Sequence, residues 1–274
     1  MRVCLASIDD EETVDVHGAR STVRVSVHTR AVNIVGHRGA SAAEKENTPA
    51  AFEAADRMGA DGVELDVRIR VDGETGSRLV VCHDPLPVDP VAADALADLG
   101  TVLRACGARM LINVEIKNSV DDGGFDPTMA VVEPTVEAML RHDPDPARWL
   151  VSSFSIETID RIRDVAPDIP TAYLCHALDE RTISITVERG HRAIHPWAPA
   201  VEAHGVEAAH DAGLVVNTWT VNDPDRIVEL AALGVDGVCT DVPDIARRAL
   251  GLDAGYVDAT PTWGINPVGG GRPA

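Results

Sequence analysis

The stretch GADGVELDV, residues 59–67, contains the clearest structural signal in this sequence. Its two acidic residues, Glu64 and Asp66, lie two positions apart, so on a β-strand their side chains point to the same face. The apolar residues at positions 63, 65 and 67 point to the opposite face. Two carboxylates on one face of a buried strand repel each other and are costly to ionise. The stretch therefore predicts a strand that packs on one side and carries chemistry on the other.

Outward from this strand, short apolar runs alternate with helical patterns along the chain. Alternation of this kind indicates a parallel sheet with crossover helices. The predicted strands are residues 32–36, 62–67, 79–82, 110–116, 149–153, 171–175, 193–196, 214–220 and 237–240. The predicted helices are residues 48–58, 91–106, 128–141, 156–165, 201–212 and 224–233. A chain of 274 residues suits one large domain, so we expect an α/β protein built as a single (β/α)8 TIM barrel.

Two details of the pattern depart from a regular barrel. Nine strand-like runs are present where a barrel needs eight, and the run at 193–196 is the shortest and contains a proline. We therefore expect that this run is not a full strand of the barrel. The segment between residues 67 and 79 is too short for a helix, which predicts a tight extended connection in place of a crossover.

The two ends of the chain differ from the barrel pattern. We expect residues 1–30 to form an extension outside the barrel, residues 31–250 to form the barrel domain, and residues 251–274, rich in glycine and proline, to be a disordered tail. The N-terminal residues as written lack the apolar run of a secretory signal. No stretch approaches the roughly 18 apolar residues that a membrane-spanning helix needs.

The overall composition excludes some classes of partner. The formal net charge is −20 at pH 7, and a surface this acidic argues against binding of nucleic acid or anionic membranes, which needs basic patches. An anionic small-molecule substrate would require positive charge supplied locally by the site. The five cysteines are widely spaced and form no Cys-x-x-Cys pair, which favours a reducing compartment and predicts a cytoplasmic protein. Nothing in the sequence sets the oligomeric state.

Ionisable residues gather at the ends of the predicted strands. The first strand is followed by His37 and Arg38, the third by His83, and the fourth contains Glu115 and is followed by Lys117. The second strand contains the acidic pair described above. Parallel barrels place their active sites at the carboxyl ends of the strands. We therefore expect these groups to meet at one rim.

Three carboxylates at this rim predict a metal site. Glu64, Asp66 and Glu115 form an all-oxygen set that suits Mg²⁺ or Ca²⁺ rather than zinc. A divalent cation would also resolve the repulsion between the carboxylates. The alternative is an ion network without metal, in which the acidic pair is neutralised by Arg38 and Lys117. That network would leave few cations for a substrate.

The remaining rim residues favour chemistry on a phosphodiester. Histidine titrates near neutrality, so His37 and His83 can act as base or acid. Arg38 can hold a phosphoryl group through its planar fork of donors, and Lys117 adds a second positive charge. Together with a metal, these groups suit an anionic phosphodiester whose charge increases in the transition state.

Eight segments resemble, in order, the signature segments of glycerophosphodiester phosphodiesterases. They are GHRGA (36–40), ENTP (46–49), GADGVELDV (59–67), VVCHD (80–84), NVEIK (113–117), SSF (152–154), NTWTVN (217–222) and GVDGVCTD (234–241). The match spans roughly residues 32–245. The resemblance implies a barrel that hydrolyses glycerophosphodiesters to an alcohol and glycerol 3-phosphate. It implies acid/base catalysis by His37 and His83, metal binding by Glu64, Asp66 and Glu115, phosphate binding by Arg38 and Lys117, and a glycerol-side wall formed by Trp219.

The sequence departs from the family pattern after the third strand. The usual insertion that overhangs the site is nearly absent here, and the proline-rich stretch PLPVDP, residues 85–90, follows Asp84. The sequence therefore does not predict which alcohol lies on the far side of the phosphate. Two other functions stay open as well: phospholipase D-like cleavage of lysophospholipids or sphingomyelin, which predicts an apolar groove at the rim, and a catalytically silent barrel that binds phosphodiesters.

Overall fold

The computed structural model describes residues 13–16, 19–22, 32–71, 76–252 and 261–265. The chain divides into two units, Met1–Ala31 and Val32–Ala274. In the first unit, β1 (Thr13–Val16) and β2 (Ala19–Thr22) form an antiparallel pair. The rest of the predicted extension lies outside the described residues, and so do residues 253–260 and 266–274 of the predicted tail.

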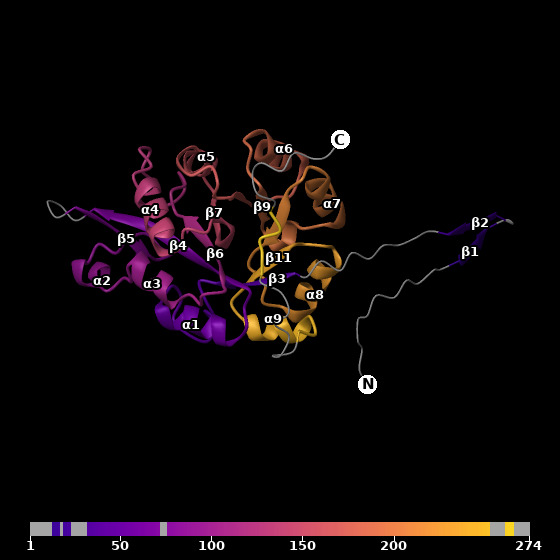
Figure 1. Ribbon diagram of the computed structural model, residues 1–274, viewed down its shortest axis with the longest axis horizontal. Coiled ribbons are helices and arrows are strands. Elements are labelled where there is room, and N and C mark those ends of the chain that lie inside the picture. The colour runs from indigo at the N-terminus through magenta and orange to yellow at the C-terminus, as the bar shows by residue number, and fades with distance from the viewer. Residues whose placement is uncertain (1–12, 17–18, 23–31, 72–75, 253–260, 266–274) are drawn as a thin grey trace. The chain divides into compact units, whose positions relative to one another are not determined.

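The second unit is a closed barrel of eight parallel strands, as the sequence predicted (Figure 1). Each strand pairs with the next, and the last strand pairs with the first. The strands in order around the barrel are β3 (Asn33–His37), β4 (Gly62–Val71), β6 (Leu111–Ile116), β7 (Trp149–Ser153), β8 (Thr171–Cys175), β9 (Ala193–Pro196), β10 (Val215–Thr218) and β11 (Gly237–Thr240).

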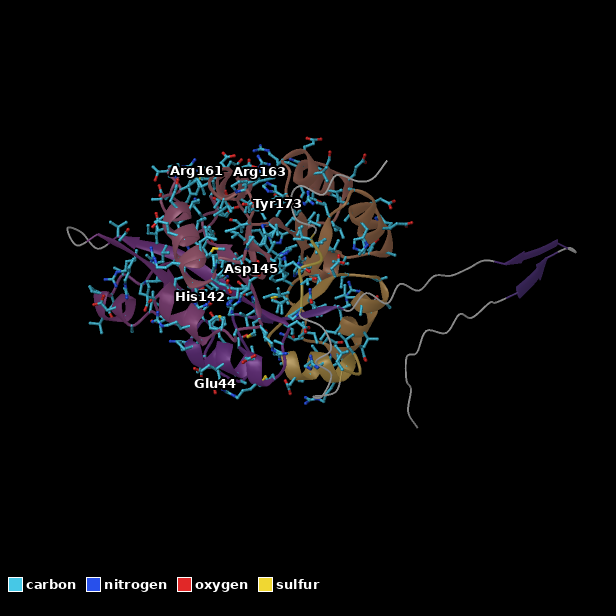
Figure 2. The ribbon with its side chains drawn as sticks, in the orientation of Figure 1. Glu44, His142, Asp145, Arg161, Arg163 and Tyr173 are labelled. Carbon is cyan, nitrogen blue, oxygen red and sulfur yellow. The ribbon has the colours of Figure 1, made fainter. Side chains whose placement is uncertain are left out.

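Figure 2 shows the side chains on the same ribbon. Helices connect the strands and cover the outside of the barrel (Figure 1). They are α1 (Pro49–Arg57), α2 (Pro90–Asp94), α3 (Leu99–Ala105), α4 (Val132–His142), α5 (Ile156–Val165), α6 (Glu180–Glu188), α7 (Ala203–Asp211), α8 (Pro224–Ala232) and α9 (Pro243–Ala249). Helix α1 begins at Pro49 because Thr48 caps it by accepting a hydrogen bond from the backbone N–H of Ala51. Its buried residues are Ala51, Phe52, Ala54 and Ala55.

The prediction of a single helix over residues 91–106 was wrong. The segment is divided into α2 and α3, and Asp98 caps α3 by accepting from the backbone N–H of Thr101. Helices α6 and α9 were missed. A capping box between Asp179 and Thr182 marks the start of α6 and was present in the sequence as a signal.

The assignment of the surplus strand was also wrong. The run at 193–196 is a full strand of the barrel, β9, which is buried throughout and pairs with β8 and β10. The surplus run is β5 (Ser77–Val81), which pairs antiparallel with the far end of β4. Strand β4 continues past the barrel to Val71, so the two strands form a hairpin, and Figure 1 shows it beside α2. A hairpin needs no crossover helix, which explains the short connection.

The amino ends of the strands enclose an apolar floor. Inward-facing side chains at or near strand starts pack around Trp263, which is 3% exposed; they include Leu111, Leu150, Ala193 and Val215. Hydrogen bonds fasten this segment, since the indole N–H of Trp263 donates to the carbonyl of Arg148 and Thr262 accepts from Asn33. Residues 261–265 fall within the range predicted as a disordered tail, but here they close one end of the barrel.

No helix in the described ranges is long and apolar enough to cross a membrane.

Candidate active site

Three buried carboxylates form the centre of the site, at the carboxyl ends of β4 and β6. Glu64, Asp66 and Glu115 are 4%, 1% and 8% exposed, and one oxygen of each lies within 4.8 Å of those of the other two. Asp66 and Glu115 are direct neighbours in the parallel pairing of the two strands. The sequence predicted this trio, and strand register brings it together.

The burial of the trio disturbs its protonation. Burial raises the pKa of Glu64 well above its ordinary value, and repulsion from Asp66 and Glu115 adds to the effect. Burial likewise raises the pKa of Glu115 to about 7. Burial would also raise the pKa of Asp66, but Lys117, Arg38 and a hydrogen bond from Asn47 outweigh it and lower that pKa. Asp66 is therefore the most acidic of the three carboxyl groups.

The carboxylates fit a hard divalent cation. Oε1 of Glu64 is buried without a partner, and Oδ1 of Asp66 is buried with only the ammonium of Lys117 beside it, at 3.3 Å. Buried oxygens without partners are rare in folded proteins and call for an ion or a water. The ligand set contains only oxygen, which Mg²⁺ and Ca²⁺ prefer. These residues therefore suit the metal that the sequence predicted.

Two cations lie against the same carboxylates. Nζ of Lys117 is 2.6 Å from Oε1 of Glu115 and 3.3 Å from Oδ1 of Asp66. Nε of Arg38 is 3.2 Å from Oδ2 of Asp66, and its Nη1 is 2.9 Å from Glu46. Part of the ion network considered from the sequence is thus present. Glu64, however, is bound through the backbone N–H of Arg38, at 3.0 Å, rather than by a side-chain cation.

The loop after β3 presents Arg38 to the site. Arg38 has a φ of 55° and Gly39 a φ of 86°, both in the left-handed region. A Cβ at Gly39 would lie 2.5 Å from the backbone carbon of Ala51, so only glycine fits there. The loop also brings Asn47 to Asp66, to which its Nδ2 donates at 2.8 Å. Asn47 was not predicted as a site residue, although it lies in the ENTP segment.

His37 is held by an aspartate from the other end of the chain. Its Nδ1 lies 2.7 Å from Oδ1 of Asp241, which directly follows β11. Burial would raise the pKa of Asp241, but hydrogen bonds from His37, Asn222 and Ser41 lower it to about 2. Asp241 is thus an anion that orients the imidazole. This role of Asp241 was not predicted from the sequence; the available signal was that the last strand of a barrel lies beside the first.

His83 reaches the site from a different kind of element. It lies in the loop after β5, outside the parallel barrel, rather than at the end of a third barrel strand as predicted. Its Nδ1 is 2.9 Å from Oδ1 of Asp84, and its side chain is 38% exposed. The hydrogen bond from His83 lowers the pKa of Asp84.

Aromatic side chains form the opposite wall. Trp219 packs edge-on against Phe154, with ring centroids 5.4 Å apart, and against His176 at 5.8 Å. Its indole N–H donates to the carbonyl of His195 at 2.8 Å, which fixes the ring. Trp219 therefore lines the pocket instead of filling the core.

One pocket contains nearly all of the predicted residues. It encloses about 580 Å³, counting the part open to solvent, and it extends from the rim down to Trp263. Its lining includes His37, Arg38, Glu64, His83, Glu115, Lys117 and Trp219. Asp66 lies behind this surface, in contact with Lys117 and Asn47.

The chain matches the model of the Glycerophosphoryl diester phosphodiesterase family over residues 37–95 and 85–245. It is 30% identical over 248 residues to a glycerophosphodiester phosphodiesterase of Bacillus altitudinis, covering 78% of this chain and 96% of the relative. It is 26% identical over 242 residues to one from Caldanaerobacter subterraneus, covering 77% and 94%.

Solved structures agree on the fold. A phosphodiesterase from Oleispira antarctica, in complex with the product sn-glycerol-3-phosphate, superposes with a TM-score of 0.70 at 21% identity, covering 80% of this chain and 96% of that one. A glycerophosphodiester phosphodiesterase from Parabacteroides distasonis superposes with a TM-score of 0.68 at 22% identity, covering 80% and 97%.

The fold and the site together define an enzyme of the phosphoric diester hydrolase class. It is a parallel barrel whose acidic centre lies beside two cations. The chain belongs to the glycerophosphoryl diester phosphodiesterase family.

Proposed function

We propose that the protein hydrolyses glycerophosphodiesters to an alcohol and sn-glycerol 3-phosphate, with a divalent metal, Mg²⁺ or Ca²⁺, held by Glu64, Asp66 and Glu115. The observation that carries the proposal is the pocket itself, whose lining brings two histidines and two cations together with Glu64 and Glu115, while Asp66 completes the carboxylate trio behind it. The product named for the O. antarctica relative is the one expected here.

The metal, Arg38 and Lys117 would each contact a different part of the phosphate or stabilise its charge. A bound metal would supply Lewis-acid stabilisation of the phosphoryl oxygens. Arg38 and Lys117 face the same pocket and would hold the anionic phosphate, where their charges oppose the repulsion from an acidic protein. The burial of Lys117 favours its neutral form, but Glu115 and Asp66 raise its pKa to about 12, so it stays charged. Trp219 and Phe154 would form the wall against the glycerol.

The histidines would move the protons. In His37, a proton on Nδ1 is held by Asp241, which leaves Nε2, 3.5 Å from the hydroxyl of Thr220, as the ring nitrogen that would face the substrate. Asp84 contacts Nδ1 of His83 in the same way. One histidine would take a proton from the attacking nucleophile and the other would give one to the departing alcohol.

The test is a substrate panel combined with metal removal. Glycerophosphocholine, glycerophosphoethanolamine and glycerophosphoinositol should each release sn-glycerol 3-phosphate with Mg²⁺ or Ca²⁺ present, and turnover should stop in chelator. Glu64→Gln should reduce turnover on the order of a hundredfold or more and weaken metal binding in calorimetry. Glu133→Gln on the exposed face of α4 is the matched control and should be neutral. Full activity of Glu64→Gln in excess chelator would falsify the metal assignment.

A second candidate substrate is a lysophospholipid. A second pocket shares Lys117 with the first, and its lining combines the apolar residues Ile69, Pro85, Leu86 and Val131 with the polar residues Arg68, Asn118 and Asp126. Its apolar part could receive an acyl chain. Release of choline from detergent-dispersed lysophosphatidylcholine, at a rate comparable with that from glycerophosphocholine, would favour this substrate.

We also propose that residues 1–30 form an extension separate from the catalytic barrel of residues 31–250, and that the protein acts in the cytoplasm. The support for the second point is that the described cysteines, Cys82, Cys106, Cys175 and Cys239, are all free thiols.

A further inference from the structure

Arg68 is a buried cation to which the proposed chemistry assigns no task. It is 5% exposed, although it lies on the part of β4 that continues beyond the barrel. Burying a guanidinium is unfavourable unless its charge and its donors are matched. Its partners therefore define what it does.

The guanidinium of Arg68 binds the main chain of His83. Nε and Nη2 both donate to the carbonyl oxygen of His83, at 3.2 and 2.7 Å. Nη1 donates to the carbonyl of Gly123 at 3.1 Å, and Nη2 lies 3.4 Å from Oδ1 of Asp122. One side chain thus joins the loop after β5 to the loop after β6.

His83 has little other support among the described residues. Its imidazole pairs with Asp84, which is 88% exposed and so gives a weak anchor. The backbone N–H of the neighbouring Cys82 donates to the backbone carbonyl of Asp66. This bond fixes the start of the loop but not the residues that follow it. His37 differs, because it ends a barrel strand and its aspartate is half-buried.

We propose that Arg68 is a positioning residue for His83: it holds the backbone of residue 83 at the rim so that the imidazole stays within reach of the phosphodiester. The inference rests on the proposed function of His83 in proton transfer. A displacement of about 1 Å can cost on the order of a hundredfold in rate, so loss of two bonds to one carbonyl has a kinetic consequence.

Arg148 supplies a matched control at the opposite end of the barrel. It is also largely buried, it donates to the carbonyls of Met110 and Gly107, and it pairs with Asp143. Its set of partners is the same in kind as that of Arg68, but it contacts neither histidine loop. A purely structural role for a buried arginine predicts equal effects at both positions.

The experiment compares Arg68→Gln with Arg148→Gln in the full chain. Both should lower the melting temperature by similar amounts. Arg68→Gln should lower kcat about tenfold or more with KM changed less than about threefold. Arg148→Gln should leave kcat within about twofold of the wild type. Equal kcat in the two variants overturns the proposal.

Histidine ring signals in ¹⁵N NMR give a readout that does not depend on turnover. Arg68→Gln should shift or broaden the His83 signal, assigned from its loss in His83→Ala, and leave the His37 signal in place. Arg68→Lys keeps the charge but lacks the fork, so it should move the His83 signal in the same direction and supplies the test if Arg68→Gln does not fold. An unmoved His83 signal in the lysine variant overturns the proposal, whereas absent turnover in the wild type would overturn only the proposed function.

Discussion

The two ends of the barrel interior are built from the same strands but contain opposite kinds of side chain. Strand β6 begins with Leu111 in the apolar floor around Trp263 and ends with Glu115 in the carboxylate trio. The floor buries apolar surface, which stabilises the fold at about 25 cal/mol per Å². The rim buries carboxylate oxygens that accept no hydrogen bond, which costs stability and suits the binding of a cation.

The difference shows that one barrel can place the electrostatic repulsion of its site at one end and the apolar packing that stabilises its fold at the other. Repulsion at the rim is tolerable because the floor and the layer under the outer helices bury clusters of apolar side chains. A change at the rim should therefore mainly alter turnover, and a change at the floor should mainly alter the free energy of unfolding.

Replacement of the histidines tests the rim and should have the largest effect. We expect His37→Ala and His83→Ala each to lower turnover between about a hundredfold and ten-thousandfold, because general acid/base catalysis is lost. Both side chains are partly exposed, at 18% and 38%, so the melting temperature should change little. Steady-state kinetics and thermal melts check the prediction.

His210 gives the matched control, because it also pairs with an aspartate, Asp236, at 2.9 Å, but on α7 outside the pocket. His210→Ala should leave turnover unchanged. A catalytic-site variant that melts far earlier yet turns over normally while folded would assign its histidine a structural role.

Replacement of Trp263 tests the floor. Trp263→Ala should lower the free energy of unfolding by about 3 kcal/mol or more, because it opens a cavity among apolar neighbours. Turnover of the folded fraction should stay within a few-fold of the wild type. Urea denaturation with Trp197→Ala as the control checks this, since Trp197 is 46% exposed. Equal stability of the two variants would show that the floor does not depend on the tryptophan.

Replacement of His195, which lies in the pocket between the rim and the floor, should have the smallest effect. His195 is 5% exposed, and burial lowers its pKa to about 3. The folded protein therefore keeps it neutral while the unfolded chain takes up a proton below pH 6.5, so its contribution to stability is present above pH 6.5 and is lost as the pH falls. Between pH 7 and pH 5 the wild type should lose about 2 kcal/mol more than His195→Gln in urea denaturation. Parallel pH dependences in the two proteins would contradict a neutral buried His195.

The local sequence pattern was enough to predict the site residues that lie on single barrel strands. Glu64 and Asp66 share a face because strand geometry fixes the direction of alternate side chains. The carboxyl ends of parallel strands meet at one rim, so Glu115 and Lys117 could be placed beside them. The metal preference followed from the ligand atoms alone.

Pattern failed where two segments looked alike but had different partners. The runs at 79–82 and 193–196 are both short and apolar, and neither their length nor their period shows whether a strand pairs parallel or antiparallel. The sequence therefore placed His83 on a barrel strand, although it lies in a loop held by Arg68.

The sequence by itself determined the barrel, the carboxylate trio and the residue types at the rim, because these depend on periods of two and 3.6 residues and on the chemistry of each side chain. Only the tertiary structure decided that Asp241 orients His37 across 204 positions and that Trp263 closes the floor. Contacts of that kind carry no local signal, since they arise when barrel closure brings the last strand beside the first and folds the chain end against the strand starts.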